Sequence, residues 1–144
     1  MQKLFETIEM IEEKLEQILQ ITNNQRAILL QKDASSETVG LLEEMAKYKE
    51  SFTTEIESIE TVFQEAYNKQ KENIQKEGKA QALRQHVENV LGLKETIIKA
   101  ESQNVILMKE YMKNHLQPVK FQAAPDEVIN QYKVQKQYQS YQKS

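Results

Sequence analysis

The stretch "LFETIEMIEEKLEQI", residues 4–18, decides the fold. Its apolar residues recur at alternating steps of four and three, the spacing of a helix that buries one narrow stripe against other helices. The members of the stripe are Leu4, Ile8, Ile11, Leu15 and Ile18. Mostly charged and polar residues lie between them. The pattern therefore predicts a long amphipathic helix that needs partner helices to cover its apolar face.

The composition of the chain agrees with this prediction. Of its 144 residues, 39% are hydrophobic and 28% are charged, and there are three Gly, two Pro and no Trp. Such a profile is typical of long amphipathic helices. Glutamates interrupt the first 17 residues too early for a signal peptide, no apolar run is long enough to cross a membrane, and cysteine is absent. We therefore expect a cytosolic all-α protein.

A second helix is expected after the polar turn "KDASSET", residues 32–38, because Asp, Ser and Thr side chains accept hydrogen bonds from the first N–H groups of a helix. Its apolar stripe contains two successive steps of four, from Tyr48 to Ile56, which predicts a local break in the heptad pattern. The expected stripe consists of Leu41, Met45, Tyr48, Phe52, Ile56, Ile59 and Phe63.

A third helix is expected from near Ala80 to at most Gln117, because Pro118 cannot continue a helix. The apolar stripe is lost around Gly78, so a turn near residues 77–79 is favoured over one continuous helix. Pro125 opens a short fourth helical pattern, and the polar end of the chain predicts a segment that is mobile in the free protein.

These patterns together predict an elongated antiparallel helical bundle or coiled coil of three long helices with a short or mobile C-terminal helix. The expected division is a bundle domain at 1–117, followed by a linker and C-terminal tail at 118–144. A thin rod has much surface and little core, so self-association as a homodimer is compatible with the sequence, which does not decide between a monomer and a dimer.

The residues offer little for catalysis. His86 and His115 lie 29 positions apart, and neither has a metal-ligating neighbour at helical spacing. The three glycines are scattered, so no phosphate-binding loop is present. The net charge of −3 does not suit nucleic acid, and the glutamates beside the apolar stripes do not suit a membrane surface. We therefore expect no enzyme, no metal, no cofactor, no nucleic acid and no membrane insertion.

Protein binding remains, and the third helix carries its strongest signal. Glu101 and Asn104 fall on the same helical line as Val90, Ile97 and Met108. A carboxylate there must reach water, pair with a cation or receive donors from a partner. Asn104 is interpreted as a register-setting residue, and methionines in this helix suit a surface that adapts to a partner, although ordinary core packing is the alternative.

The pattern resembles flagellar export chaperones of the FlgN type. The resemblance lies in "AILLQKDASSETVGLLEEMAKYKESFTTEIESIE", residues 27–60, and in "IIKAESQNVILM", residues 97–108. The matching positions are Asp33, Leu41, Leu42, Lys49, Phe52, Glu101 and Asn104. It implies a cytosolic chaperone that holds helical termini of hook–filament junction (hook-associated) proteins and delivers them to the flagellar export apparatus.

In that family the C-terminal part of the chain takes up the substrate. Together with the two interrupting polar residues, the resemblance implies a partner-binding set of Glu101, Asn104, Val105, Met108, Met112, Ile129, Tyr132 and Tyr138. Two alternatives stay open. One is a structural coiled-coil oligomer or spacer without a client, and the other is a regulator that binds another protein through the same face.

Overall fold

The computed structural model describes residues 1–31 and 35–114, which form three helices and no strand. The helices are α1 (Gln2–Leu30), α2 (Ser36–Lys76) and α3 (Ala80–Asn114). The prediction of an all-α fold is confirmed for this part of the chain. The expected fourth helix and the tail at 118–144 lie outside the described residues.

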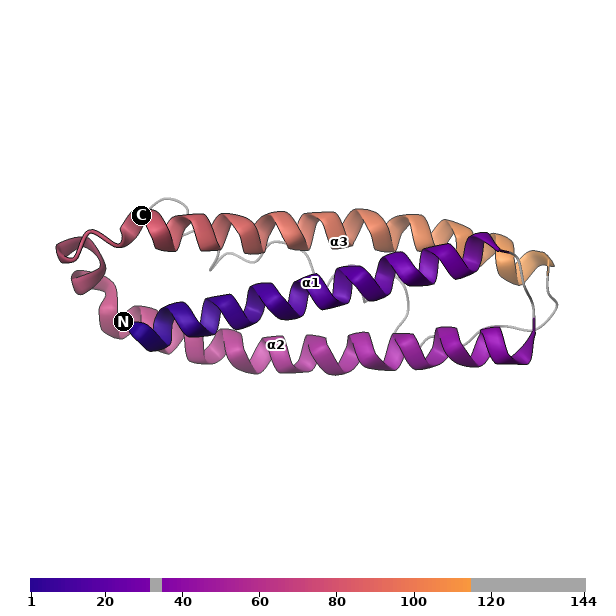
Figure 1. The fold of residues 1–144 in the computed structure, drawn as a ribbon, viewed down its shortest axis with the longest axis horizontal. Coiled ribbons are helices and arrows are strands. Elements are labelled where there is room, and N and C mark those ends of the chain that lie inside the picture. The colour runs from indigo at the N-terminus through magenta and orange to yellow at the C-terminus, as the bar shows by residue number, and fades with distance from the viewer. Residues whose placement is uncertain (32–34, 115–144) are drawn as a thin grey trace.

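The three helices lie alongside one another along the long axis of the molecule (Figure 1). α1 and α2 run in opposite directions, and α3 returns parallel to α1. α1 packs against both α2 and α3 along its length. The backbones of α2 and α3 approach each other less closely, and the long side chains of Lys49 and Lys94 make ion pairs between these two helices.

Both ends of α2 have the residues that their geometry requires. At its start, the Ser35 hydroxyl accepts a hydrogen bond from the Thr38 N–H at 3.2 Å, as expected for a helix that begins in this polar turn. At its end, Gly78 has a φ of +69°, a conformation that costs an L-residue with a side chain about 1–2 kcal/mol. The N–H groups of Gly78 and Lys79 donate to the carbonyls of Gln75 and Ile74 at 3.2 and 2.9 Å. The chain therefore turns at Gly78, as expected.

Each helix buries one stripe at alternating steps of four and three. α1 buries Leu4, Ile8, Ile11, Leu15, Ile18, Thr22, Gln25 and Leu29. α3 buries Leu83, Val87, Val90, Lys94, Ile97, Glu101, Asn104, Met108 and Tyr111 at the same steps. The apolar members form one large cluster along most of the bundle and a smaller one, Leu29, Leu42, Met108 and Tyr111, at the end where α1 finishes and α2 begins.

The predicted stripe of α2 is correct in its second half and wrong in its first. Ile56 and Phe63 are buried in the core, and Phe52 and Ile59 are partly buried against it. Leu41 and Tyr48, which were expected in the core, are 46% and 55% exposed. The buried stripe instead follows Leu42, Ala46, Lys49, Thr53, Ile56, Glu60, Phe63, Tyr67 and Ile74. It has no break, apart from one seven-residue gap at the partly buried Gln70. The error arose because Lys49, Thr53 and Glu60 are polar, so the more apolar neighbouring flank of the helix was taken for the core.

Candidate functional site

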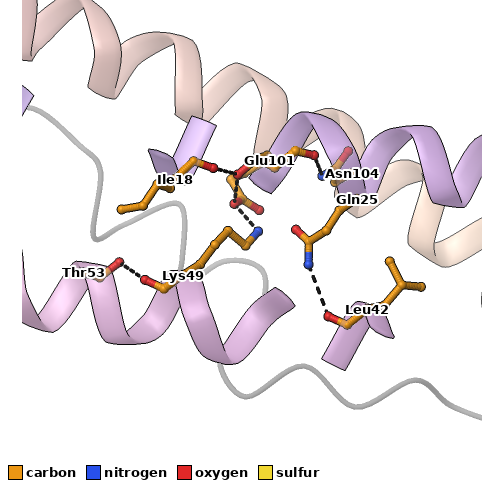
Figure 2. A network of polar contacts seen from close by, with 8 residues as sticks. Ile18, Gln25, Leu42, Lys49, Thr53, Glu101 and Asn104 are labelled. Carbon is orange, nitrogen blue, oxygen red and sulfur yellow. Dashed lines mark hydrogen bonds and ion pairs between the residues drawn. The ribbon is translucent and has the colours of Figure 1, made fainter. Parts of the chain in front are cut away.

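The interior of the bundle holds a buried ion pair. The Lys49 Nζ atom of α2 lies 2.6 Å from Glu101 Oε1 of α3 (Figure 2), and the two side chains are only 7% and 8% exposed. Burial lowers the pKa of the Lys49 ammonium below its usual 10.5, and the neighbouring Glu101 opposes that shift. The carboxylate that interrupts the apolar stripe of α3 is therefore matched by a cation from its own chain.

α1 completes this polar layer. The Thr22 hydroxyl lies 3.1 Å from Glu101 Oε1 and 2.8 Å from the carbonyl of Ile18. Asn104 Nδ2 donates to the Thr22 carbonyl at 3.0 Å, which ties α3 to α1. Asn104 Oδ1 is buried without a hydrogen-bond partner among the described residues, so this asparagine costs stability relative to an apolar residue. Such a cost is typical of a residue that specifies how helices align.

A second ion pair lies closer to the turn and has the opposite polarity. Lys94 Nζ of α3 lies 3.5 Å from Glu60 Oε1 of α2, and both side chains are buried. Burial also lowers the pKa of Lys94 below 10.5, with Glu60 opposing the shift. In the first pair α2 supplies the cation, whereas in the second it supplies the anion.

The opposite polarities fix the alignment of α2 with α3. If α3 slid by seven residues in one direction, Lys94 would replace Glu101 opposite Lys49. If it slid by seven residues in the other direction, Glu101 would replace Lys94 opposite Glu60. Either slip would bury two like charges, which repel strongly where water cannot screen them. The two pairs therefore select the observed register against both neighbouring registers.

Outside this layer, titratable side chains contact one another at the surface of the bundle. The partly buried His86 ring contacts the Glu12 carboxylate and packs against the Phe5 ring in a T-shaped arrangement, with 5.8 Å between the ring centroids. Within residues 1–31 and 35–114, no group of three or more His, Asp or Glu side chains could hold a metal ion. His115 lies outside the described residues. The contacts of His86 join α1 to α3.

A second apolar row runs along α3 beside its buried stripe. Its members recur at steps of seven and are Leu91, Ile98, Val105 and Met112. Leu91 is buried, Ile98 and Val105 are partly buried, and Met112 is 37% exposed. Accessibility is therefore lowest at Leu91 and highest at Met112, near the end of α3.

This row lies on the flank of α3 that faces α2. The opposite flank contacts α1, because Arg26 donates to Gln103 at 2.5 Å and Glu12 contacts His86. On α2, the flank that bears Glu55 faces α1, since Lys14 lies 2.6 Å from Glu55. The remaining flanks of α2 and α3 therefore face each other.

The facing flank of α2 is acidic. Glu43, Glu50 and Glu57 recur there at steps of seven and reach the surface. The register fixed by Glu60 and Lys94 places them level with the apolar row of α3. We call this surface the α2–α3 face, and it comprises Glu43, Glu50, Glu57, Leu91, Ile98, Val105 and Met112. Toward the turn, a cavity of about 340 Å³ opens between the same two helices, lined in part by Tyr67, Lys71 and Arg84.

The structure separates the predicted partner-binding residues into three groups. Glu101, Asn104 and Met108 are buried, and Met108 packs in the cluster with Leu29, Leu42 and Tyr111. Val105 and Met112 lie on the α2–α3 face. Ile129, Tyr132 and Tyr138 lie outside the described residues. The sequence analysis named Lys49 only as a position of the family resemblance, and it missed Glu60 and Lys94. The available signal was that these charged residues continue the spacing of the buried stripes.

In comparisons with known proteins, no family model, no curated protein and no solved structure matches the chain. None of the helices in the described part of the chain has the length and apolar character needed to cross a membrane.

Proposed function

We propose that this chain is a cytosolic polypeptide-binding protein, without catalytic activity, whose elongated antiparallel coiled-coil bundle presents the α2–α3 face to an amphipathic helical segment. The observation that carries the proposal is the partly exposed row Ile98, Val105 and Met112 level with the acidic row of α2. An apolar row beside negative charge fits a client helix that has an apolar stripe and a basic flank.

The resemblance to flagellar export chaperones of the FlgN type supplies the class of client. The proposed clients are helical termini of hook–filament junction proteins, whose apolar stripes need cover before they are passed to the export apparatus. Three of the residues that carry the resemblance, Lys49, Glu101 and Asn104, hold the helices of the bundle in register. This alignment keeps Val105 and Met112 in place on the α2–α3 face.

The test measures binding of the full chain to a helical terminal segment of a hook-associated protein by titration calorimetry. Met112→Gln should weaken binding by about 10- to 100-fold, since burying a methionine side chain contributes about 1.5–3 kcal/mol. Ile106→Gln is the matched control, because Ile106 is 61% exposed on the outer surface of the same helix. Equal loss in both variants, or no binding at all, would rule out the α2–α3 face as the client site.

A structural oligomer is the second candidate. Leu30, Leu41 and Ile106 are exposed apolar side chains on three helices at one end of the bundle, where a second copy could cover them. Sedimentation of the free chain distinguishes the candidates. A stable oligomer that does not bind a segment of a hook-associated protein supports the structural role. A chain that binds such a segment supports the chaperone role.

A further inference from the structure

We propose that the C-terminal segment of this same chain, residues 118–144, docks on the α2–α3 face when no client is bound. The segment is therefore a competitor for the face on which a client would bind. The docking is inferred from the residues of the α2–α3 face and from the sequence of the segment. Only the competition with a client rests on the proposed function.

Charge complementarity favours this occupant. Residues 118–144 contain four lysines against one aspartate and one glutamate. Both acids precede the last 17 residues, 128–144, which contain three of the lysines. The α2 side of the face carries the opposite charge, because Glu43, Glu50 and Glu57 recur there at steps of seven. Lysines drawn to this row would stay near water, so the attraction should weaken as salt is added.

The apolar residues of the segment match the other side of the face. Ile129 and Tyr132 precede Lys133 and Lys136, and Tyr138 follows them. A tyrosine buries its ring and keeps its hydroxyl in water, which suits the partly exposed row of α3. Ile129, Tyr132 and Tyr138, which the sequence predicts to contact a partner, would therefore contact the bundle of their own chain when no client is bound.

The geometry of the chain brings the segment to the right place. α3 ends at Asn114, beside Met112 and close to the level of Glu43. The 30 residues from 115 to 144 span about 45 Å even if fully helical and about twice that if extended. Glu57 lies 14 positions after Glu43 in the same helix, which corresponds to about 21 Å. The segment therefore reaches the whole row in either conformation.

Competition follows from this docking. A client that covers Val105 and Met112 must first displace the segment, so the free protein keeps its apolar row covered. Only molecules with an undocked segment can bind a client, so the apparent client affinity equals the intrinsic affinity multiplied by the undocked fraction.

The experiment uses the full chain with a single nitroxide label on Gln137→Cys, because the protein has no cysteine of its own. The label should broaden amide signals of residues 43–57 in α2 and 98–112 in α3 and spare the exposed side of α1 around Gln17 and Gln20. Mixing labelled chains with isotope-enriched unlabelled chains separates contacts within a chain from those between copies. Uniform broadening of all three helices, broadening confined to α1, or broadening only between copies would overturn the proposal.

Two charge reversals provide the matched comparison. Glu50→Lys with Glu57→Lys should remove the broadening, whereas Glu44→Lys with Glu65→Lys, the same change on exposed positions away from the face, should leave it. Equal effects of both pairs would contradict the docking. Lys133→Glu with Lys136→Glu should release the segment without altering the face and raise client affinity. An unchanged affinity with the broadening lost would overturn the competition and leave the docking intact.

Discussion

The ammonium of Lys49 and the carboxylate of Glu101 lie 2.6 Å apart in the interior of the bundle, on helices whose backbones approach each other closely at few points. Removing one partner leaves the other charge buried and uncompensated. We therefore expect Lys49→Met to lower the free energy of unfolding by about 3–5 kcal/mol, and Lys49→Met with Glu101→Leu to recover most of that loss. Urea titration followed by circular dichroism measures both.

The control is the surface pair of Lys14 and Glu55, which has the same 2.6 Å separation but side chains that are 23% and 48% exposed. Glu55→Ala should cost less than about 1 kcal/mol, because water screens an exposed pair. If Lys49→Met costs no more than Glu55→Ala, the buried pair does not hold the helices as described.

The opposite polarity of the two buried pairs makes a prediction about register. Exchanging one pair, Lys49→Glu with Glu101→Lys, keeps both attractions but makes α2 the anionic partner in each, so a slip of seven residues no longer buries like charges. In a Gly78→Ala background, where the turn is weakened, this exchange should produce a second population with α3 displaced by about 10 Å. Distances between spin labels on Ser58→Cys and Lys113→Cys report the displacement.

Exchanging both pairs at once restores the opposite polarities and is the matched control. That variant, with Glu60→Lys and Lys94→Glu added, should return to a single distance in the same background. Two populations in both variants, or one in both, would show that the pairs do not select the register.

The lysine pKa values predict how stability depends on pH. Lys49 and Lys94 have pKa values below 10.5 in the folded protein, because burial disfavours their charge. Between the folded and unfolded pKa values the unfolded chain holds more protons, so stability rises with pH in that window. The contribution is fully present above 10.5 and is lost as pH falls through the folded pKa.

The measurement compares the protein with the Lys49→Met, Glu101→Leu variant at several pH values up to 10.5. The free energy of unfolding should rise more steeply with pH in the unsubstituted protein than in the variant, which retains only the Lys94 contribution. Parallel slopes would mean that Lys49 titrates alike in both states.

The stripes of α1 and α3 could be predicted from sequence because apolar residues occupy most of their buried positions, and their few polar positions continue the same spacing. The turn at Gly78 was also predictable, since a glycine coincides with a loss of the apolar stripe. The stripe of α2 was not, because Lys49 and Glu60 become core residues only when Glu101 and Lys94 face them from α3. That pairing depends on the alignment of two helices, which neither helix encodes alone. The same alignment places Val105 beside the acidic row, so the α2–α3 face could not be seen in the sequence of α3.

The two glycines of the α2–α3 hairpin should respond in opposite directions to alanine. Gly78 has a positive φ of 69°, so Gly78→Ala should lower the free energy of unfolding by about 1–2 kcal/mol although a Cβ there meets no atom within 4 Å. Gly92 lies inside α3, and a Cβ there also meets nothing within 4 Å, so Gly92→Ala should raise the free energy of unfolding by about 0.5–1 kcal/mol. Thermal unfolding of both variants checks the signs. Because neither Cβ collides with a neighbour, the difference isolates backbone conformation, and a shift of the same sign in both would contradict the turn at Gly78.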